Sequence, residues 1–249
     1  MTSFEDHFSG LAKEYAQYRP HYPSELFTYL ASVCPERRVA WDCGTGNGQA
    51  AVELAAHFSC VIATDASATQ IAQAVRHERV SYLVEQAEDA GFKSACLDLI
   101  TVAVAVHWFD MQRFYMEVRR VLIPGGIIAV WTYHLAATEP AIDRVVEHLY
   151  GDVLAGFWPE RIQFVHEHYR TLPFPFAELD PPPFIIQAEW NLEQYLGFID
   201  SWSAVRRYRE LQGIHPLQLV WEDLLAAWGE PDRRVAIRWP MYLRVGRVQ

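Results

Sequence analysis

The sequence predicts an α/β protein with a doubly wound, mostly parallel sheet, and three features support this class. Short apolar runs alternate with segments of helical periodicity through the first half of the chain. The first of these runs ends in a glycine-rich turn that leads into a predicted helix. The run at residues 97–106 is continuous and rich in β-branched residues, as expected for a strand buried on both faces. Ligands of such folds bind at the carboxyl ends of the strands.

A predicted strand and a predicted helix flank the glycine-rich turn. Residues 38–41 form the buried strand, and residues 49–58 place apolar residues at helical spacing. The motif D-C-G-T-G-N-G fills positions 42–48 between them. Glycine allows a sharp turn and leaves room for a ligand, and the helix N-terminus behind it offers free N–H groups. The pattern predicts a nucleotide-type ligand, with a turn that binds nothing as the alternative.

The spacing of the glycines argues against a dinucleotide. A dinucleotide fingerprint reads G-x-G-x-x-G, and its third glycine would fall at Gln49, whereas this chain has Gly48. The acidic Asp42 also precedes the first glycine, where its carboxylate can meet an ammonium group and would repel a pyrophosphate. An NAD-dependent oxidoreductase therefore remains only as an alternative function.

A second apolar run, residues 60–64, ends on an acidic residue. Asp65 lies 23 positions after Asp42 and occupies the tip of the predicted second strand. A carboxylate at this place can accept hydrogen bonds from the ribose hydroxyls of a nucleoside. A helix N-cap shared with Ser67 is the alternative role, and both can hold together.

The rest of the chain continues the sheet and then departs from the alternation of strands and helices. We expect further strands at 81–84, 97–106, 127–131, 184–190 and 235–245 and helices at 141–154, 161–169, 192–208 and 217–228. The stretch from Phe174 to Pro183 contains three consecutive prolines and is predicted to be a loop. Residues 132–183 interrupt the alternation and predict a cap that shapes a substrate pocket.

Composition limits the classes of partner. The chain has 249 residues, 51% of them hydrophobic, and a formal net charge of −10. Without a dense run of lysine or arginine, neither nucleic acid nor an anionic membrane is an expected partner. No signal pattern opens the chain and no apolar segment reaches membrane-spanning length, so we expect a soluble cytoplasmic protein. The sequence makes no prediction of oligomeric state.

The cysteines predict neither a disulfide framework nor a metal site. Cys34, Cys43, Cys60 and Cys96 are scattered and form no C-x-x-C pair. Buried free thiols are the expected state.

Several blocks together resemble one enzyme family. D-C-G-T-G-N-G is similar to motif I of the class I S-adenosylmethionine-dependent methyltransferases. Y-A-Q-Y-R-P-H-Y-P at 15–23, A-V-H-W-F-D at 105–110 and R-V-L-I-P-G-G at 120–126 resemble the type 11 group, which includes trans-aconitate and cantharidin methyltransferases. The resemblance implies a Rossmann-like seven-stranded sheet with a helical cap. It also implies methyl transfer from S-adenosylmethionine to a small molecule at an oxygen, either carboxylate or hydroxyl.

The resemblance also implies an organisation of the chain. Residues 1–249 would form a single methyltransferase domain. Residues 1–37 would form helices that cover the cofactor, 38–131 the cofactor-binding core, 132–183 the substrate-side helices and loop, and 184–249 the closing strands and helices.

The residues that the resemblance places on the cofactor are Tyr15, Arg19, Asp42, Gly44, Thr45, Gly46, Gly48, Asp65, Ala66, Gln86, Ala87, Glu88 and Val104. The glycines would lie against the methionyl part and Asp42 near its ammonium group. Arg19 would hold the methionyl carboxylate with Tyr15, and Ala87 would bond adenine through its backbone. Two positions depart from the family pattern: Gln86 replaces an aspartate as the adenine acceptor, and Val104 replaces a glutamine. No metal is implied.

His107 is the candidate catalytic residue, because it closes the fourth predicted strand at the edge where substrate should lie. It can act as a general base for a hydroxyl acceptor or donate a hydrogen bond to a carboxylate, and a packing role is the alternative. Trp108 can offer a π face or belong to the core. Tyr133, His134, Trp202 and Arg206 are further candidates on the acceptor side. A non-catalytic protein that binds S-adenosylmethionine is the remaining alternative.

Overall fold

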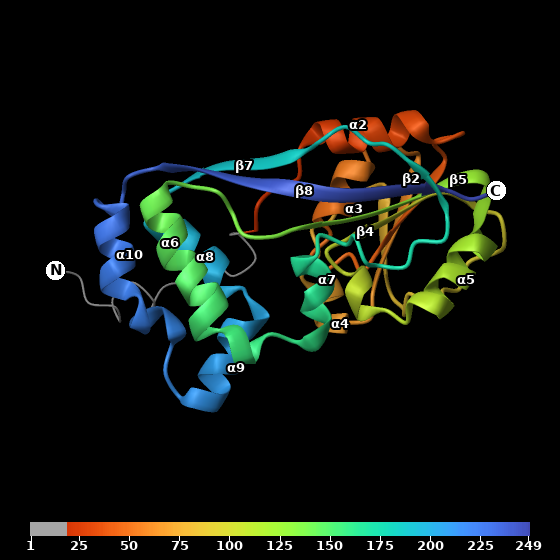
Figure 1. Ribbon diagram of the computed structural model, residues 1–249. Helices are drawn as coiled ribbons and strands as arrows, with labels where there is room; N and C mark the ends of the chain where they lie inside the picture. The colour runs from red at the N-terminus through yellow and green to blue at the C-terminus, as the bar shows by residue number, and fades with distance from the viewer. Residues whose placement is uncertain (1–18) are drawn as a thin grey trace. The chain divides into compact units, whose positions relative to one another are not determined.

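The computed structural model describes residues 19–249 and divides the chain into two compact units (Figure 1). Of the described residues, the first unit comprises 19–21, 135–162 and 186–239, and the second comprises 22–134, 163–185 and 240–249. The glycine-rich turn and Asp65 both belong to the second unit.

The second unit is built on a mixed sheet. Its strands are β1 (Val39–Cys43), β2 (Cys60–Asp65), β3 (Val80–Val84), β4 (Leu97–Ala103), β5 (Leu122–Tyr133), β6 (Ala177–Leu179) and β8 (Val235–Arg247), of which β8 begins in the first unit. The order is β3-β2-β1-β4-β5-β8-β6, with β7 (Ile185–Trp190) pairing β8. The five strands from β3 to β5 are parallel, and β8 runs antiparallel to both β5 and β6. This order confirms the predicted Rossmann-like, mostly parallel α/β class.

Helices of the second unit connect these strands. They are α2 (Ser24–Val33), α3 (Gln49–Leu54), α4 (Ala68–Ala72), α5 (Met111–Val121) and α7 (Gln163–His166). Two of them start at a side-chain cap: the Ser67 hydroxyl accepts a hydrogen bond from the Gln70 N–H, and the Asp110 carboxylate accepts one from the Arg113 N–H. Each cap satisfies a helix N–H group that has no partner within the helix. Both caps lie at the carboxyl edge of the parallel strands, where they fix the loops that follow β2 and β4.

The first unit is mainly helical. Its longer helices are α6 (Pro140–His148), α8 (Leu192–Asp200), α9 (Ser203–Gln212) and α10 (Trp221–Trp228). A capping box of Asn191 and Gln194 starts α8, and Arg233 pairs with Glu139 through both of its terminal nitrogens. No helix in the described part of the chain is long and apolar enough to cross a membrane.

The structure differs from the sequence-based prediction in the proline-rich stretch. Residues 174–183 were expected to be a loop, but Ala177–Leu179 form the edge strand β6. β6 is short, and its burial pattern shows two exposed residues and one half-buried residue, so it lacks the apolar alternation that identifies a strand. Its pairing depends on β8, which is far away in the sequence.

The predicted fourth strand also ends earlier than expected. β4 stops at Ala103, and Val104 takes a left-handed backbone with φ of 53°. The 3-10 helix η2 (Val106–Trp108) follows. A β-branched residue rarely adopts this backbone, so apolar composition alone extended the predicted strand too far.

A buried carboxylate connects the start of β1 to β4. The Asp98 side chain is fully buried, and its Oδ2 accepts hydrogen bonds from the backbone N–H groups of Arg38 and Val39, each at 2.8 Å. The guanidinium of Arg38 lies 3.5 Å from Asp98 Oδ1 but is 60% exposed. The backbone donors therefore carry most of this interaction, since an exposed guanidinium is screened by water.

Replacement of Asp98 by alanine should destabilise the protein, because two partly buried N–H groups lose their acceptor. We expect the free energy of unfolding to fall by about 2–4 kcal/mol in a urea titration. Arg38→Ala is the matched control and should cost less than about 1 kcal/mol. Equal losses in the two variants would contradict the assignment to the backbone donors.

Candidate functional site

The glycine-rich turn joins β1 to α3 through three glycines with left-handed backbones. The φ angles of Gly44, Gly46 and Gly48 are 70°, 56° and 84°. A Cβ atom on Gly44 would lie 2.7 Å from Ala105 Cβ, and one on Gly48 would lie 2.2 Å from Tyr82 Oη. A Cβ on Gly46 would meet nothing within 4 Å. Glycine is thus required at positions 44 and 48 because a Cβ atom there would clash with a neighbouring side chain, while Gly46 faces open space.

Asp65 holds this turn against the end of β2. Its Oδ2 accepts a hydrogen bond from the Gly46 N–H at 2.9 Å, and its Oδ1 accepts one from the Ser67 N–H at 2.8 Å. A carboxylate offers about four lone-pair positions, so both oxygens can accept further bonds. The predicted cap and the predicted ligand contact are therefore compatible.

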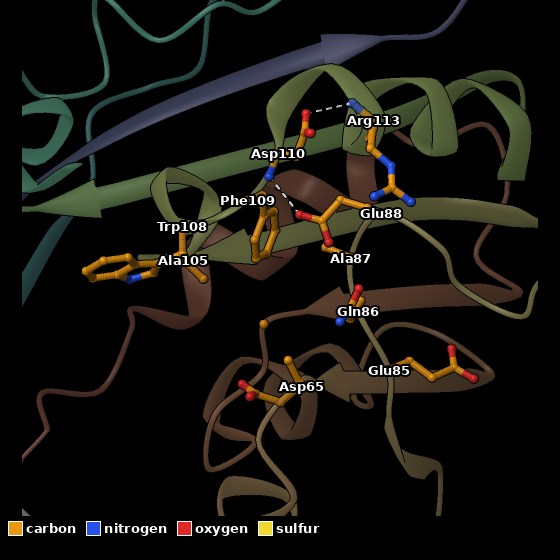
Figure 2. Close-up of a pocket in the computed structure, with 12 residues that line it drawn as sticks. Asp65, Glu85, Gln86, Ala87, Glu88, Ala105, Trp108, Phe109, Asp110 and Arg113 are labelled. Atoms are coloured by element: carbon orange, nitrogen blue, oxygen red, sulfur yellow. Dashed lines mark hydrogen bonds between the residues drawn. The ribbon is translucent and has the colours of Figure 1, made fainter.

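A pocket of about 440 Å³ opens beside Asp65 (Figure 2). Its lining residues come from the turn, the end of β2, the loop after β3 and the segment after β4. They are Gly44, Asp65, Ala66, Glu85, Gln86, Ala87, Glu88, Ala105, Trp108, Phe109, Asp110 and Arg113. In the view of Figure 2, Phe109 and Glu88 lie above Asp65 and Glu85, with Gln86 between the two levels. An aromatic ring and several polar groups therefore converge on one cavity.

Six of the predicted cofactor residues line this pocket, namely Gly44, Asp65, Ala66, Gln86, Ala87 and Glu88. The Glu88 carboxylate accepts a hydrogen bond from the Asp110 N–H at 2.7 Å and so joins the β3 loop to the start of α5. Trp108, predicted on the acceptor side, also lines the pocket and is 49% exposed. Sequence reasoning did not assign Phe109 or Arg113, although Phe109 lies within the quoted A-V-H-W-F-D block.

Asp42 lies beneath the turn and does not line the pocket. Its side chain is fully buried, and it accepts hydrogen bonds from the hydroxyls of Thr45 at 2.6 Å and Thr101 at 2.8 Å. Burial raises the pKa of this carboxyl to about 6, against the opposing effect of the two hydroxyl bonds. Asp42 therefore fixes Thr45 and places negative potential under the turn.

Val104, the last of the predicted cofactor positions in this unit, shapes the chain after β4. Its left-handed backbone donates its N–H to the Trp131 carbonyl at 2.9 Å. The 3-10 helix η2 follows directly after this residue. Val104 does not line the pocket, and the cofactor contact predicted for this position stays a prediction.

His107 and Trp108 follow one another but have opposite environments. His107 is 2% exposed, and its Nδ1 lies 2.7 Å from the hydroxyl oxygen of Tyr169. Tyr169 is itself fully buried, and burial raises the pKa of its phenol far above the usual value. No local sequence signal identifies Tyr169 as a partner of His107, because the two residues are 62 positions apart in the chain.

His134 belongs to a cluster of imidazoles after β5. Its ring centroid lies 5.2 Å from that of His166 and 6.0 Å from that of His168. Burial, with the neighbouring imidazoles, lowers the pKa of His134 to about 4, so it is neutral at pH 7. Within residues 19–249, no group of three or more histidine, cysteine or acidic side chains is arranged to hold a metal ion.

The remaining predicted residues are divided between the two units, and one of them lies outside the described residues. Tyr133 ends β5 in the second unit. Trp202 and Arg206 belong to the first unit, at the start of α9 and within it. Arg19 is exposed and also belongs to the first unit, and Tyr15 lies outside the described residues. The roles given to these residues remain predictions.

Comparison with known proteins identifies the relatives of this chain. A family model described as a methyltransferase domain matches residues 41–130. A Dictyostelium discoideum protein described as a methyltransferase is 30% identical over 249 residues, covering 97% of this chain and 95% of that protein. A solved structure from Anaeromyxobacter dehalogenans, described as a type II methyltransferase, is 46% identical with a TM-score of 0.85, covering 92% of this chain and 97% of that one. Methyltransferase cfoB of Aspergillus candidus is 25% identical and covers 72% of this chain and 64% of that protein.

Substitutions at two glycines should distinguish a position needed for ligand binding from a position needed for stability. Gly46→Ala strains only a left-handed backbone, so it should cost about 1–2 kcal/mol of stability while weakening S-adenosylmethionine binding at least tenfold. Gly48→Ala must also displace Tyr82, so it should cost about 2–4 kcal/mol. Thermal unfolding and calorimetry measure the two effects. Unchanged binding by Gly46→Ala would show that no ligand lies against the turn.

Asp42→Asn should stabilise the protein at high pH. Because the pKa of Asp42 is about 6 in the folded protein, against 3.8 for an unperturbed aspartate, the folded state binds this proton more tightly. The contribution of Asp42 to stability therefore falls as pH rises from about 4 to 6 and stays low above that range. We expect Asp42→Asn to gain about 1–3 kcal/mol at pH 8 and to lose this advantage near pH 4. If the gain in unfolding free energy of Asp42→Asn is the same at pH 4 and pH 8, the raised pKa of Asp42 is wrong.

Proposed function

The chain belongs to the type 11 group of class I S-adenosylmethionine-dependent methyltransferases, and from this we propose that it transfers the methyl group of its cofactor to an oxygen of a small molecule. The observation that carries the site assignment is the pocket beside Asp65, whose lining unites the loops after β2, β3 and β4. Those loops lie at the carboxyl ends of parallel strands, where this fold class binds nucleotides.

The residues of the pocket fit the adenosyl part of S-adenosylmethionine. Asp65 would accept hydrogen bonds from the ribose hydroxyls through the lone pairs that Gly46 and Ser67 leave unused. The Gln86 amide oxygen would accept from the adenine amino group, and the Ala87 backbone N–H would donate to the ring. Phe109 would pack against the purine, since it offers an aromatic wall in the same cavity.

The methionyl part would lie along the glycine-rich turn. The open space above Gly46 is where a ligand can approach the backbone, and the buried Asp42 supplies negative potential for the ammonium group from below. Arg19 and Tyr15 are our candidates for the methionyl carboxylate. When bound, the cofactor supplies an activated methyl group on a positively charged sulfur.

The protein's contribution to methyl transfer would be orientation and exclusion of water, since no metal or covalent intermediate is required. The acceptor-side candidates are His107, Trp108, Tyr133, His134, Trp202 and Arg206. The net charge of −10 disfavours nucleic acid as the acceptor and supports a small molecule. Of the acceptor types, a small carboxylic acid agrees with the trans-aconitate-like sequence blocks.

Calorimetry with S-adenosylmethionine, followed by detection of S-adenosylhomocysteine, tests this proposal. The purified chain would be incubated with a panel of small di- and tricarboxylic acids, phenols and alcohols. We expect micromolar binding and turnover of at least one oxygen acceptor. Binding of the cofactor with methylation only of nitrogen or carbon acceptors would overturn the oxygen assignment, and binding of NAD instead would overturn the cofactor site.

Asp65→Ala should weaken S-adenosylmethionine binding by about 1.5–3 kcal/mol, the range for lost charge-assisted hydrogen bonds. The dissociation constant is measured by calorimetry on protein whose folding is checked by circular dichroism. Glu85→Ala is the matched control, because Glu85 lines the same pocket and its Oε2 accepts a hydrogen bond from the Gly91 N–H at 3.3 Å. If both variants weaken binding equally, general charge and not the ribose contact explains the effect.

A further inference from the structure

We propose that this chain forms a two-fold symmetric dimer in which the β3 strands of two copies pair antiparallel at the edge of the sheet. The inference concerns an interaction surface of the second unit and does not depend on the methyl-transfer reaction. β3 lies at one end of the strand order, and among the described residues it pairs only with β2. Its other edge can therefore accept a further strand.

The surface around β3 exposes apolar side chains on both faces of the sheet. Leu83 is 41% exposed and Val84 is 53% exposed, and consecutive residues of a strand point to opposite faces. Val75, which precedes the strand, is 55% exposed. Residues 85–96 connect β3 to β4 and contain no helix that could cover this edge. A parallel sheet of this class normally has both faces covered, so this end of the sheet is incomplete within one chain.

The hydrogen bonds between β2 and β3 show which backbone groups of β3 face outward. At one end of the ladder the Val61 N–H donates to the Arg79 carbonyl at 2.8 Å, and at the other end the Glu85 N–H donates to the Asp65 carbonyl at 3.2 Å. Alternate residues of a strand bond to the same neighbour, so the odd-numbered residues from 79 to 85 face β2. The backbone groups of the even-numbered residues therefore point to the free edge.

These outward groups are open to another strand. The Val80 N–H donates to the His77 carbonyl at 3.1 Å, but among the described residues nothing accepts from the N–H groups of Tyr82 and Val84. Residues 80–84 contain neither a charged residue nor a proline, which are the residues that commonly block a strand edge. Pairing with another strand would satisfy the open groups without disturbing the ladder to β2.

A second copy of the chain fits this edge because β3 can pair with itself. When Tyr82 lies opposite Tyr82 of the second copy, the two residues exchange both of their backbone hydrogen bonds. The Val84 N–H then donates to the Val80 carbonyl of the second copy, and symmetry repeats this bond. The same register places Arg79 directly opposite Glu85 of the second copy.

The opposite charges at the two ends of β3 favour this antiparallel arrangement. Arg79 and Glu85 of the second copy would form a pair without mutual backbone hydrogen bonds, in which the side chains share a face and lie close together. The ion pair would occur twice by symmetry. Pairing of two copies in the parallel direction and in register would bring like charges together instead. Charge complementarity thus selects an antiparallel second copy as the partner.

Both side chains have capacity for this contact. The Arg79 side chain is 51% exposed and donates one hydrogen bond to the Ala55 carbonyl through Nη1, which leaves further N–H groups on the guanidinium. Glu85 accepts from the Gly91 N–H through Oε2, and a carboxylate can accept several bonds. In Figure 2 the Glu85 carboxylate extends away from that of Asp65. Because Glu85 also lines the cofactor pocket, the dimer contact would border that pocket.

Sedimentation velocity of the full chain without ligand tests the dimer. One pair of short strands makes a small interface, so we expect the dimer fraction to rise between about 1 and 200 μM protein. Arg79→Glu and Glu85→Arg should each weaken dimerisation about tenfold, because each places like charges opposite one another at both ends. The double variant should restore the dimer to within about threefold of the parent, since it restores both ion pairs.

Lys93→Glu is the matched control, because it makes the same change of charge on an exposed residue of the loop after β3, outside the proposed register. It should leave the dimer unchanged, and circular dichroism checks the folding of every variant. A parent that stays monomeric over the whole range would overturn the proposal. So would a dimer that Arg79→Glu leaves unchanged, or single variants that the double variant does not restore.

Disulfide formation between two variants tests the register directly. Ser81 lies opposite Leu83 of the second copy in the proposed dimer, in a pair whose short separation suits a disulfide. An oxidised mixture of Ser81→Cys and Leu83→Cys should give a linked dimer, whereas Ser81→Cys alone should give little. The four native cysteines are buried or half-buried. Equal linkage in the mixture and in Ser81→Cys alone, or no linkage in a mixture that dimerises, would overturn the register.

Discussion

The structure of the site depends on one constraint, the left-handed path of the turn between β1 and α3. Three glycines within five residues take positive φ angles, and two carboxylates hold them there. Asp65 bonds the Gly46 N–H from one side, and Asp42 bonds the Thr45 hydroxyl from beneath. Burial raises the pKa of Asp42 to about 6, so its charged carboxylate is kept beneath the turn at a cost in stability. A cost of this kind is expected where a protein keeps a binding surface instead of the most stable core.

The segment after β4 also depends on a left-handed backbone, and it contributes further residues to the site. Val104 reverses the backbone, and η2 then directs successive side chains to different places. Trp108 is half-exposed and lines the pocket beside Asp65, while His107 is buried against Tyr169. Two neighbouring residues of one short helix thus lie in different environments, one at the pocket and one in the core. Ala105, which precedes this helix, lies so near Gly44 that a Cβ atom at position 44 would clash with it, so the turn and the segment after β4 are in close contact.

The sequence predicted what depends on local pattern and missed what depends on distant partners. Apolar runs and the glycine spacing were sufficient for the parallel strands, the turn and Asp65, because each of these is encoded within a few residues. β6 has no apolar alternation and exists because β8 pairs with it. The burial of Asp42 follows from Thr101 on β4, 59 residues away. The contact of Tyr169 with His107 was missed for the same reason, since it joins residues 62 positions apart and depends on an unusual backbone that no propensity encodes.

The charges around the second unit's site limit how an acidic acceptor could be held there. Asp65, Glu85 and Glu88 line the pocket and suit a positively charged cofactor, but they repel a carboxylate. His134 cannot compensate near neutral pH, because its pKa of about 4 leaves it uncharged. Arg113 also lines the pocket, so within the second unit its guanidinium is a charged donor that can offset this repulsion.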